Sequence, residues 1–214
     1  MRTLLFLACL SATCVFGQKA SVTVTDDSFD KKGMDRATRS LFELLEVEHY
    51  TARFKLPGNK AHDVVLVMKS VFKDSIASVD TLINSVPWKK KVVGGLVFDP
   101  RELSTLVGQH IDSVHYRIRF RFGSMNMTDR TVKLPWPNHG YLLDEGLRSA
   151  GDAVPFEIGK PMPIMVLTQP YPDPPPPEQV VFYRYCFGTD IPPADWPKTF
   201  GVPHLYIFEL TLLP

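Results

Sequence analysis

Four basic side chains alternate with apolar ones in the segment SVHYRIRFRFG, residues 113–123. The basic set takes every second position: His115, Arg117, Arg119 and Arg121. The apolar set takes the positions between: Val114, Tyr116, Ile118, Phe120 and Phe122. Successive side chains of a β-strand point to opposite faces, so one face of this segment is basic and the other is apolar. The pattern therefore predicts a half-buried strand.

Basic groups on one strand face follow one another at roughly 6.5–7 Å. A guanidinium group suits anion binding because its planar fork meets an oxyanion through two parallel hydrogen bonds. The face is therefore a candidate site for anionic glycans, lipid headgroups or phosphates, with His115, Arg117, Arg119 and Arg121 as its residues. The alternative is a solvent-facing strand whose cations pair with Asp and Glu on neighbouring strands, which also discourages aggregation at a sheet edge.

Catalytic and metal-binding motifs are not recognised in the sequence. The six histidines show no HxH or HExxH spacing, and neither a GxSxG motif nor a glycine-rich phosphate loop is found. We therefore predict no catalytic residue, no metal ligand and no cofactor. A hydrolase with dispersed catalytic residues stays open, since such residues leave no local pattern.

The N-terminus has the pattern of a signal peptide over residues 1–17. Arg2 is followed by the apolar run Leu4–Leu10 and by small residues before a cut after Gly17. Cleavage lowers Lys plus Arg from 24 to 23, which equals the 23 Asp plus Glu. A neutral, exported chain argues against nucleic acid as a partner, and no later apolar run is long enough to span a bilayer.

Cleavage would also remove Cys9 and Cys14, leaving Cys186 as the single cysteine. The mature chain then has no intrachain disulfide, which excludes small disulfide-stapled folds. Cys186 is expected to be buried or to link two chains as a disulfide-bonded dimer. Asn126 begins the glycosylation sequon Asn126-Met127-Thr128, on the turn after the basic and apolar strand.

Hydrophobic periodicity predicts a mainly β fold, a β-sandwich or barrel-like antiparallel sheet with one or two short helices; an α+β fold is the alternative. Further strands are expected at 20–25, 47–56, 63–72, 92–98, 131–134, 162–168, 180–187 and 205–213. Helices are expected at 34–46, with Asp35 as the N-cap, at 75–86, and after Asp99-Pro100 within 99–109.

Sixteen of the 19 prolines lie in residues 135–214. Proline cannot donate to a sheet ladder, so this half should hold short strands joined by stiff loops. We expect one β-rich domain over residues 18–214, with a boundary near 135–140 as the alternative.

These features predict a secreted, non-enzymatic extracellular protein, either a matrix component or a binding module. Its expected partners are anionic glycans, lipid headgroups or another extracellular protein. A carrier of an apolar ligand in a β-walled cavity is the second hypothesis, and a secreted hydrolase is the third.

Overall fold

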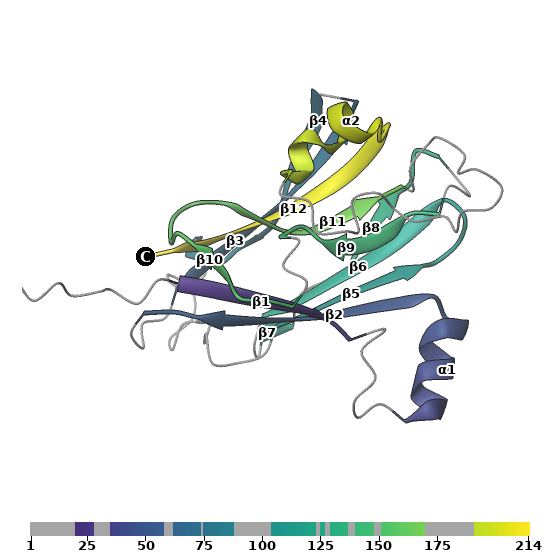
Figure 1. Ribbon diagram of the computed structural model, residues 1–214, viewed down its shortest axis with the longest axis horizontal. Helices are drawn as coiled ribbons and strands as arrows, with labels where there is room; N and C mark the ends of the chain where they lie inside the picture. The colour runs from purple at the N-terminus through teal and green to yellow at the C-terminus, as the bar shows by residue number, and fades with distance from the viewer. Residues whose placement is uncertain are drawn as a thin grey trace, which may run out of the picture.

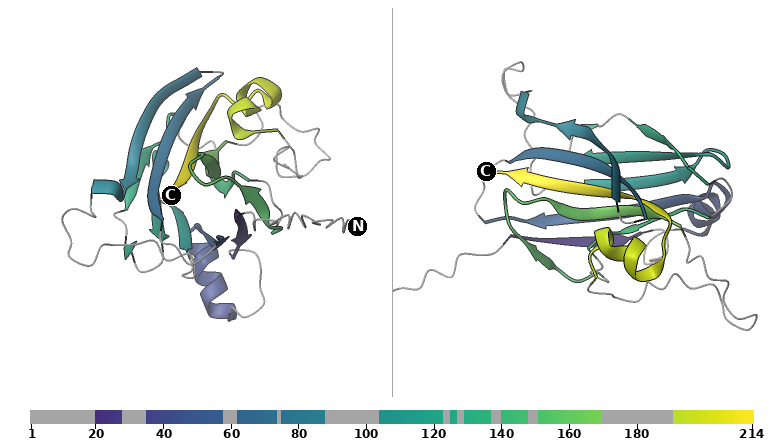
Figure 2. Two further views of the ribbon diagram at one scale, coloured as in Figure 1. Left: turned by 90° about the vertical axis from the view of Figure 1, so that its left-hand side faces the viewer. Right: turned by 90° about the horizontal axis from the view of Figure 1, so that it is seen from above.

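The computed structural model describes residues 20–27, 35–57, 62–73, 75–87, 104–122, 125–126, 129–136, 140–147, 151–169 and 191–214. These residues form two antiparallel sheets that face one another (Figures 1 and 2). The structure confirms the prediction of a mainly β protein with short helices. The signal sequence, Cys186 and the strands expected at 92–98 and 180–187 lie outside the described residues.

The seven-stranded sheet contains, in spatial order, β10 (Val154–Phe156), β1 (Ala20–Asp26), β2 (Val47–Lys55), β5 (Ser104–His110), β6 (His115–Phe122) and β7 (Met125–Asn126), with β8 (Arg130–Lys133) also paired to β6. The five-stranded sheet contains β4 (Ser75–Asn84), β3 (Asp63–Phe72), β12 (His204–Leu213), β11 (Met162–Thr168) and β9 (Leu142–Glu145). Strands from before and after residues 135–140 lie in both sheets, and one core of buried side chains fills the space between them.

The segment 113–123 forms β6, as the alternation predicts. Tyr116, Ile118 and Phe120 are buried in the core between the sheets, while Arg117 and Arg119 are exposed on the other face. The chain then turns back through β7 and β8, both antiparallel to β6. The predicted hairpin after this strand is therefore present.

The prediction of a helix at 75–86 is wrong, because Ser75–Asn84 form the edge strand β4. Its pairing with β3 is interrupted by two bulges. At the first, Leu66 pairs with Ile83 and Val67 with Thr81, so Leu82 has no partner on β3. At the second, Ser70 pairs with Ser78 and Val71 with Ile76, so Ala77 has no partner on β3. Each bulge inserts one residue and so breaks the period of two. The apolar residues then fall at spacings that resemble those of a helix.

The helix expected within 99–109 is also wrong over the described residues, since Ser104–His110 form β5. This strand pairs with β2 on one side and with β6 on the other. Backbone pairing on both edges outweighs the local helix preference that an Asp-Pro pair confers.

The two helices among the described residues lie on opposite outer sides of the sandwich (Figure 1). α1 (Arg36–Leu44) begins at Asp35, whose carboxylate accepts from the backbone N–H groups of Ala37 and Thr38, as predicted. The 3₁₀ turn η3 (Pro193–Asp195) continues into α2 (Trp196–Phe200), which covers the outer face of the five-stranded sheet. There the fully buried Trp196 packs in a second apolar cluster with Val166 and Ile207.

Candidate functional site

The outer face of the seven-stranded sheet carries the four basic residues that the sequence singles out. Arg117, Arg119 and Arg121 are exposed, and His115 is half-buried at the start of β6. The register places Lys133 of β8 beside His115. The strand therefore presents its cations to solvent, as the alternation requires.

The outer face of the sheet carries further basic residues beyond β6, on β2. The register places uncharged residues of β5 between β6 and β2: Thr105, Val107 and Gln109. On β2 the outward positions include His49, Arg53 and Lys55, which lie next to the serine and threonine side of β1. Among the described strand positions on this face, none holds a carboxylate. We refer to this surface as the cationic face; its basic residues are His49, Arg53, Lys55, His115, Arg117, Arg119, Arg121 and Lys133.

The carboxylates that the structure describes beside Arg119, His115 and His49 lie in turns. Asp129, just before β8, binds Arg119 through two contacts: the Nε–Oδ1 distance is 2.5 Å and the Nη2–Oδ2 distance is 2.7 Å. Asp112, in the turn between β5 and β6, lies 2.9 Å from His115 Nδ1. Asp27, at the end of β1, lies 3.2 Å from His49 Nδ1. For Arg119 and His115, the paired carboxylates lie in turns next to the strands and not on the strands themselves.

Two of these turn carboxylates, Asp129 and Asp112, have a lowered pKa. The hydrogen bond from Arg119 lowers the pKa of Asp129, and the hydrogen bond with the His115 side chain, followed by backbone N–H bonds, lowers the pKa of Asp112. Both carboxylates are exposed to solvent, so these contacts contribute little to stability. For Arg117, the described residues contain no ion-pair partner. Among the described residues, the lysines and arginines of the cationic face outnumber the aspartates paired with it.

Asn126 lies in β7, and the register places it beside Arg121 at the edge of the cationic face. Thr128 and the side chain of Asn126 lie outside the described residues, and so does Cys186.

A second group of polar side chains, which sequence reasoning missed, faces inward at one end of the sandwich. Glu48 of β2 accepts hydrogen bonds from the Tyr116 hydroxyl and, at 2.9 Å, from the backbone N–H of Leu143. Burial raises the pKa of Glu48 to about 8, although both hydrogen bonds act in the opposite direction. The hydroxyl of Tyr116 has room to reach Glu48 because residue 108 is glycine: a Cβ there would lie 2.0 Å from that oxygen.

Two further side chains of the seven-stranded sheet bind the backbone at 141–143. The Tyr50 hydroxyl donates to the Leu143 carbonyl at 2.7 Å, and His110 Nε2 lies 2.7 Å from the Tyr141 carbonyl oxygen. Leu143 lies in β9, the edge strand of the five-stranded sheet. These bonds join the two sheets and satisfy backbone groups at that edge.

A buried chain of hydrogen bonds continues from Tyr141 to β3. The Tyr141 hydroxyl lies 2.9 Å from His204 Nδ1, and Ser70 Oγ lies 3.0 Å from His204 Nε2. Burial lowers the pKa of His204 to about 4, so the imidazole is neutral near pH 7. A serine next to a neutral histidine resembles the start of a nucleophilic triad. However, Ser70 is only 6% exposed and His204 is fully buried, which favours a structural role.

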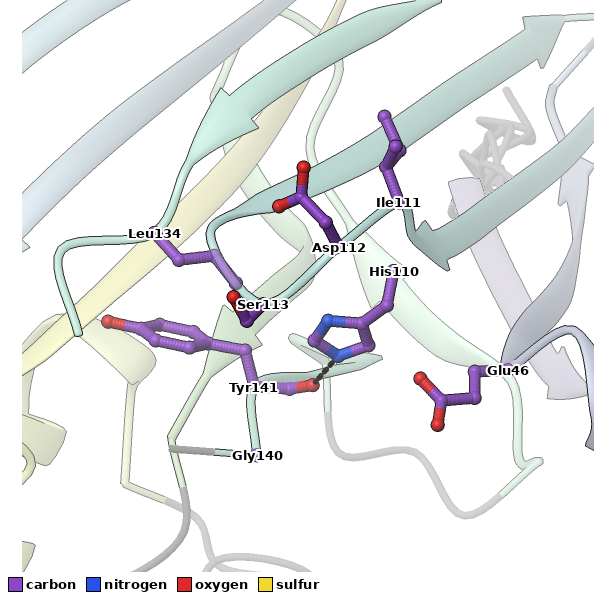
Figure 3. Close-up of a pocket in the computed structure, with 8 residues that line it drawn as sticks. All are labelled: Glu46, His110, Ile111, Asp112, Ser113, Leu134, Gly140 and Tyr141. Carbon is purple, nitrogen blue, oxygen red and sulfur yellow. Dashed lines mark hydrogen bonds between the residues drawn. The ribbon is translucent and has the colours of Figure 1, made fainter. Parts of the chain in front are cut away.

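A cavity of about 500 Å³ opens beside this polar end (Figure 3). Its lining comes from three segments: Glu46 after α1, the turn at 110–113, and residues 134, 140 and 141. The lining includes two carboxylates, Glu46 and Asp112, together with Ile111 and Leu134. A lining of this mixed character is poorly suited to an apolar ligand, because burying a charge without a partner is costly.

No group of three or more His, Cys, Asp or Glu residues is placed to hold a metal ion among the residues that the structure describes. In the same residues, no helix is long and apolar enough to cross a membrane. No protein-family model, curated protein or solved structure matches this chain.

Proposed function

We propose that this chain is a secreted, non-enzymatic extracellular protein, a matrix component or binding module, that binds a polyanion on the cationic face. The observation that carries the proposal is the distribution of charge on this face. Basic side chains occupy outward positions on β2, β6 and β8, and the described outward strand positions hold no carboxylate. A surface with one sign of charge creates a potential that attracts and orients the opposite charge.

The geometry suits a ligand with repeated anionic groups. Along β6 the arginines repeat at roughly 6.5–7 Å, and paired strands lie roughly 4.8 Å apart, so the cations form a two-dimensional array. A single small anion would occupy one or two of these groups, whereas a polyanion meets many of them at once. Arginine forks add two parallel hydrogen bonds to each sulfate, phosphate or carboxylate group.

The test compares two triple variants on immobilised heparin. Changing Arg117, Arg119 and Arg121 to serine removes three exposed cations of the cationic face. The control changes Lys73→Asn, Lys160→Ser and Lys198→Ser, which removes three exposed lysines elsewhere; asparagine is used at 73 because Lys73 has a φ of 55°. The net charge of the two variants is the same.

We expect the arginine variant to elute at lower NaCl than the wild type. The slope of log Kd against log salt should fall by roughly three, about one for each cation removed. The lysine control should elute near the wild type. Equal shifts in both variants, or no shift in the arginine variant, would show that the cationic face is not the binding surface.

Export and modification belong to the same proposal. The secreted protein is expected to begin at Gln18. If Asn126 carries an N-glycan, enzymatic removal of N-glycans should lower the mass of the protein. If Cys186 links two chains, the protein should run as a dimer on a non-reducing gel. A cytosolic protein that retains residues 1–17 would contradict the extracellular part of the proposal.

A further inference from the structure

α1 turns its apolar side to solvent. Leu41 and Leu44 of α1 and its C-cap residue Leu45 follow helical spacing, yet they are 50%, 79% and 44% exposed, and no residue of the helix is buried. An amphipathic helix of a folded domain normally packs such a stripe against the core. In this protein the arrangement is the reverse, so the stripe is available to a partner.

The contacts of α1 place it on the same side of the molecule as the cationic face. The Phe42 ring lies 6.2 Å from the ring of His49, an outward residue of β2. Gln109, an outward residue of β5, donates from Nε2 to the Leu45 carbonyl at 3.3 Å. Figure 1 shows α1 projecting from the end of β2, away from β12 and α2. Ile111, two residues beyond Gln109, adds a further exposed apolar side chain at this end.

We propose that α1 and the cationic face together dock on an anionic lipid bilayer, with the leucines of α1 entering the membrane interface; this inference rests on the proposed function. A soluble glycan would engage only the cations. A bilayer that contains anionic lipids supplies both a layer of phosphates and carboxylates for the arginines and an apolar layer for the leucines. Interfacial helices place their apolar side roughly 5–10 Å into the boundary between headgroups and acyl chains.

Charged residues of α1 lie opposite Leu41. At 100° per residue, Arg39 and Glu43 each lie roughly 160° around the axis from Leu41, so both point away from the lipid when Leu41 enters it. The stripe is short, and three leucines give only modest membrane affinity. Electrostatic attraction to anionic lipids must therefore supply the rest, as it does for other peripheral proteins that combine two weak signals.

The experiment uses sedimentation with vesicles of phosphatidylcholine alone and vesicles that also contain phosphatidylserine. One variant changes Leu41, Leu44 and Leu45 to glutamine, which keeps helix propensity. Its control, Ile76→Thr with Val79→Thr, removes two apolar side chains that are each 57% exposed on β4, in the other sheet. Each variant is also run on immobilised heparin, and thermal unfolding checks its fold.

We expect the wild type and the β4 control to bind the phosphatidylserine vesicles at least tenfold more tightly than phosphatidylcholine alone. The leucine variant should lose at least tenfold in vesicle affinity while it elutes from heparin like the wild type.

Unchanged vesicle binding in the leucine variant would overturn the inference. So would a wild type that is retained on heparin but binds no vesicles, since the partner would then be a soluble polyanion and the proposed function would stand. A third outcome would also overturn the inference: a wild type that dimerises but binds no vesicles, with a leucine variant that no longer dimerises. The leucine stripe would then contact a second copy of the chain. A separate result would remove the proposed function: an arginine variant that elutes from heparin at the same NaCl concentration as the wild type.

Discussion

The two faces of β2 and β6 differ in how their polar groups are used. On the outer face, Arg117 and Arg119 meet solvent, and Asp129, which pairs with Arg119, lies in a turn. On the inner face of the same strands, which is covered by the five-stranded sheet, the Tyr116 hydroxyl donates a hydrogen bond to Glu48. Exposed charges contribute little to folding, whereas buried polar groups are costly when left unpaired. The comparison predicts that outward changes alter binding and leave stability intact, while inward changes do the opposite.

The largest effect is expected for Glu48, as a dependence of stability on pH. Its pKa rises from 4.5 to about 8 on folding, so the folded state holds the proton more tightly than the unfolded state. Stability from this group is therefore present at low pH and is lost as pH rises toward 8. Between pH 6.5 and 8 the free energy of unfolding should fall by about 2 kcal/mol, at about 1.4 kcal/mol per pH unit.

Chemical denaturation of the wild type and Glu48→Gln across this range checks the prediction. The variant should show a flat profile above pH 6.5. Below pH 6.5 the variant should lose stability, because His204 has its pKa lowered to about 4 and the unfolded state takes up the proton first. In the wild type the contribution of Glu48 keeps rising as pH falls toward 4.5 and offsets this loss. A wild-type profile that is flat from pH 6.5 to 8 would show that Glu48 is not a buried, neutral acid.

A smaller effect is expected for Tyr50→Phe. This change removes only the hydroxyl that donates to the Leu143 carbonyl at 2.7 Å. Loss of one buried hydrogen bond should lower the free energy of unfolding by about 1 kcal/mol. Heparin elution, measured beside it, should match the wild type. A shift in elution comparable with that of the arginine variant would break the separation between the two faces.

The smallest effect on stability is expected for Asp129→Ala on the outer face. The contact with Arg119 is exposed to solvent, so the free energy of unfolding should change by less than about 0.5 kcal/mol. Heparin retention should increase, because the change removes a negative charge and frees Arg119. Earlier elution of the variant would show that Asp129 supports anion binding, and this would contradict the account of the face.

The sequence predicted those elements in which a strict period of two, or a continuous apolar run, identifies a strand. β6, β3 and β11 have the expected bounds or nearly so. β4 could not be predicted in this way, because its two bulges break the period. β5 was missed because its pairing on both sides is a long-range property that no local pattern records.

In the candidate site, too, some residues could be predicted from a local pattern and others could not. The cations of β6 follow from alternation, but the acidic partners depend on where turns fold back, and the sequence does not give that. Glu48 did carry a signal, since it shares the parity of Tyr50, Ala52 and Phe54, which face the core. Its partners Tyr116 and Leu143 are 68 and 95 residues away, so only the fold brings them together.

The most direct test of the central claim is an NMR titration of isotope-labelled protein with a heparin oligosaccharide. If the cationic face is the binding surface, the shifted backbone amides should cluster on β2, β5, β6 and β8, with the largest changes around Arg117 to Arg121. Amides of β4, β12 and α2, on the five-stranded sheet and its outer side, should stay unchanged. Shifts that concentrate on those elements, with β6 unaffected, would contradict the account.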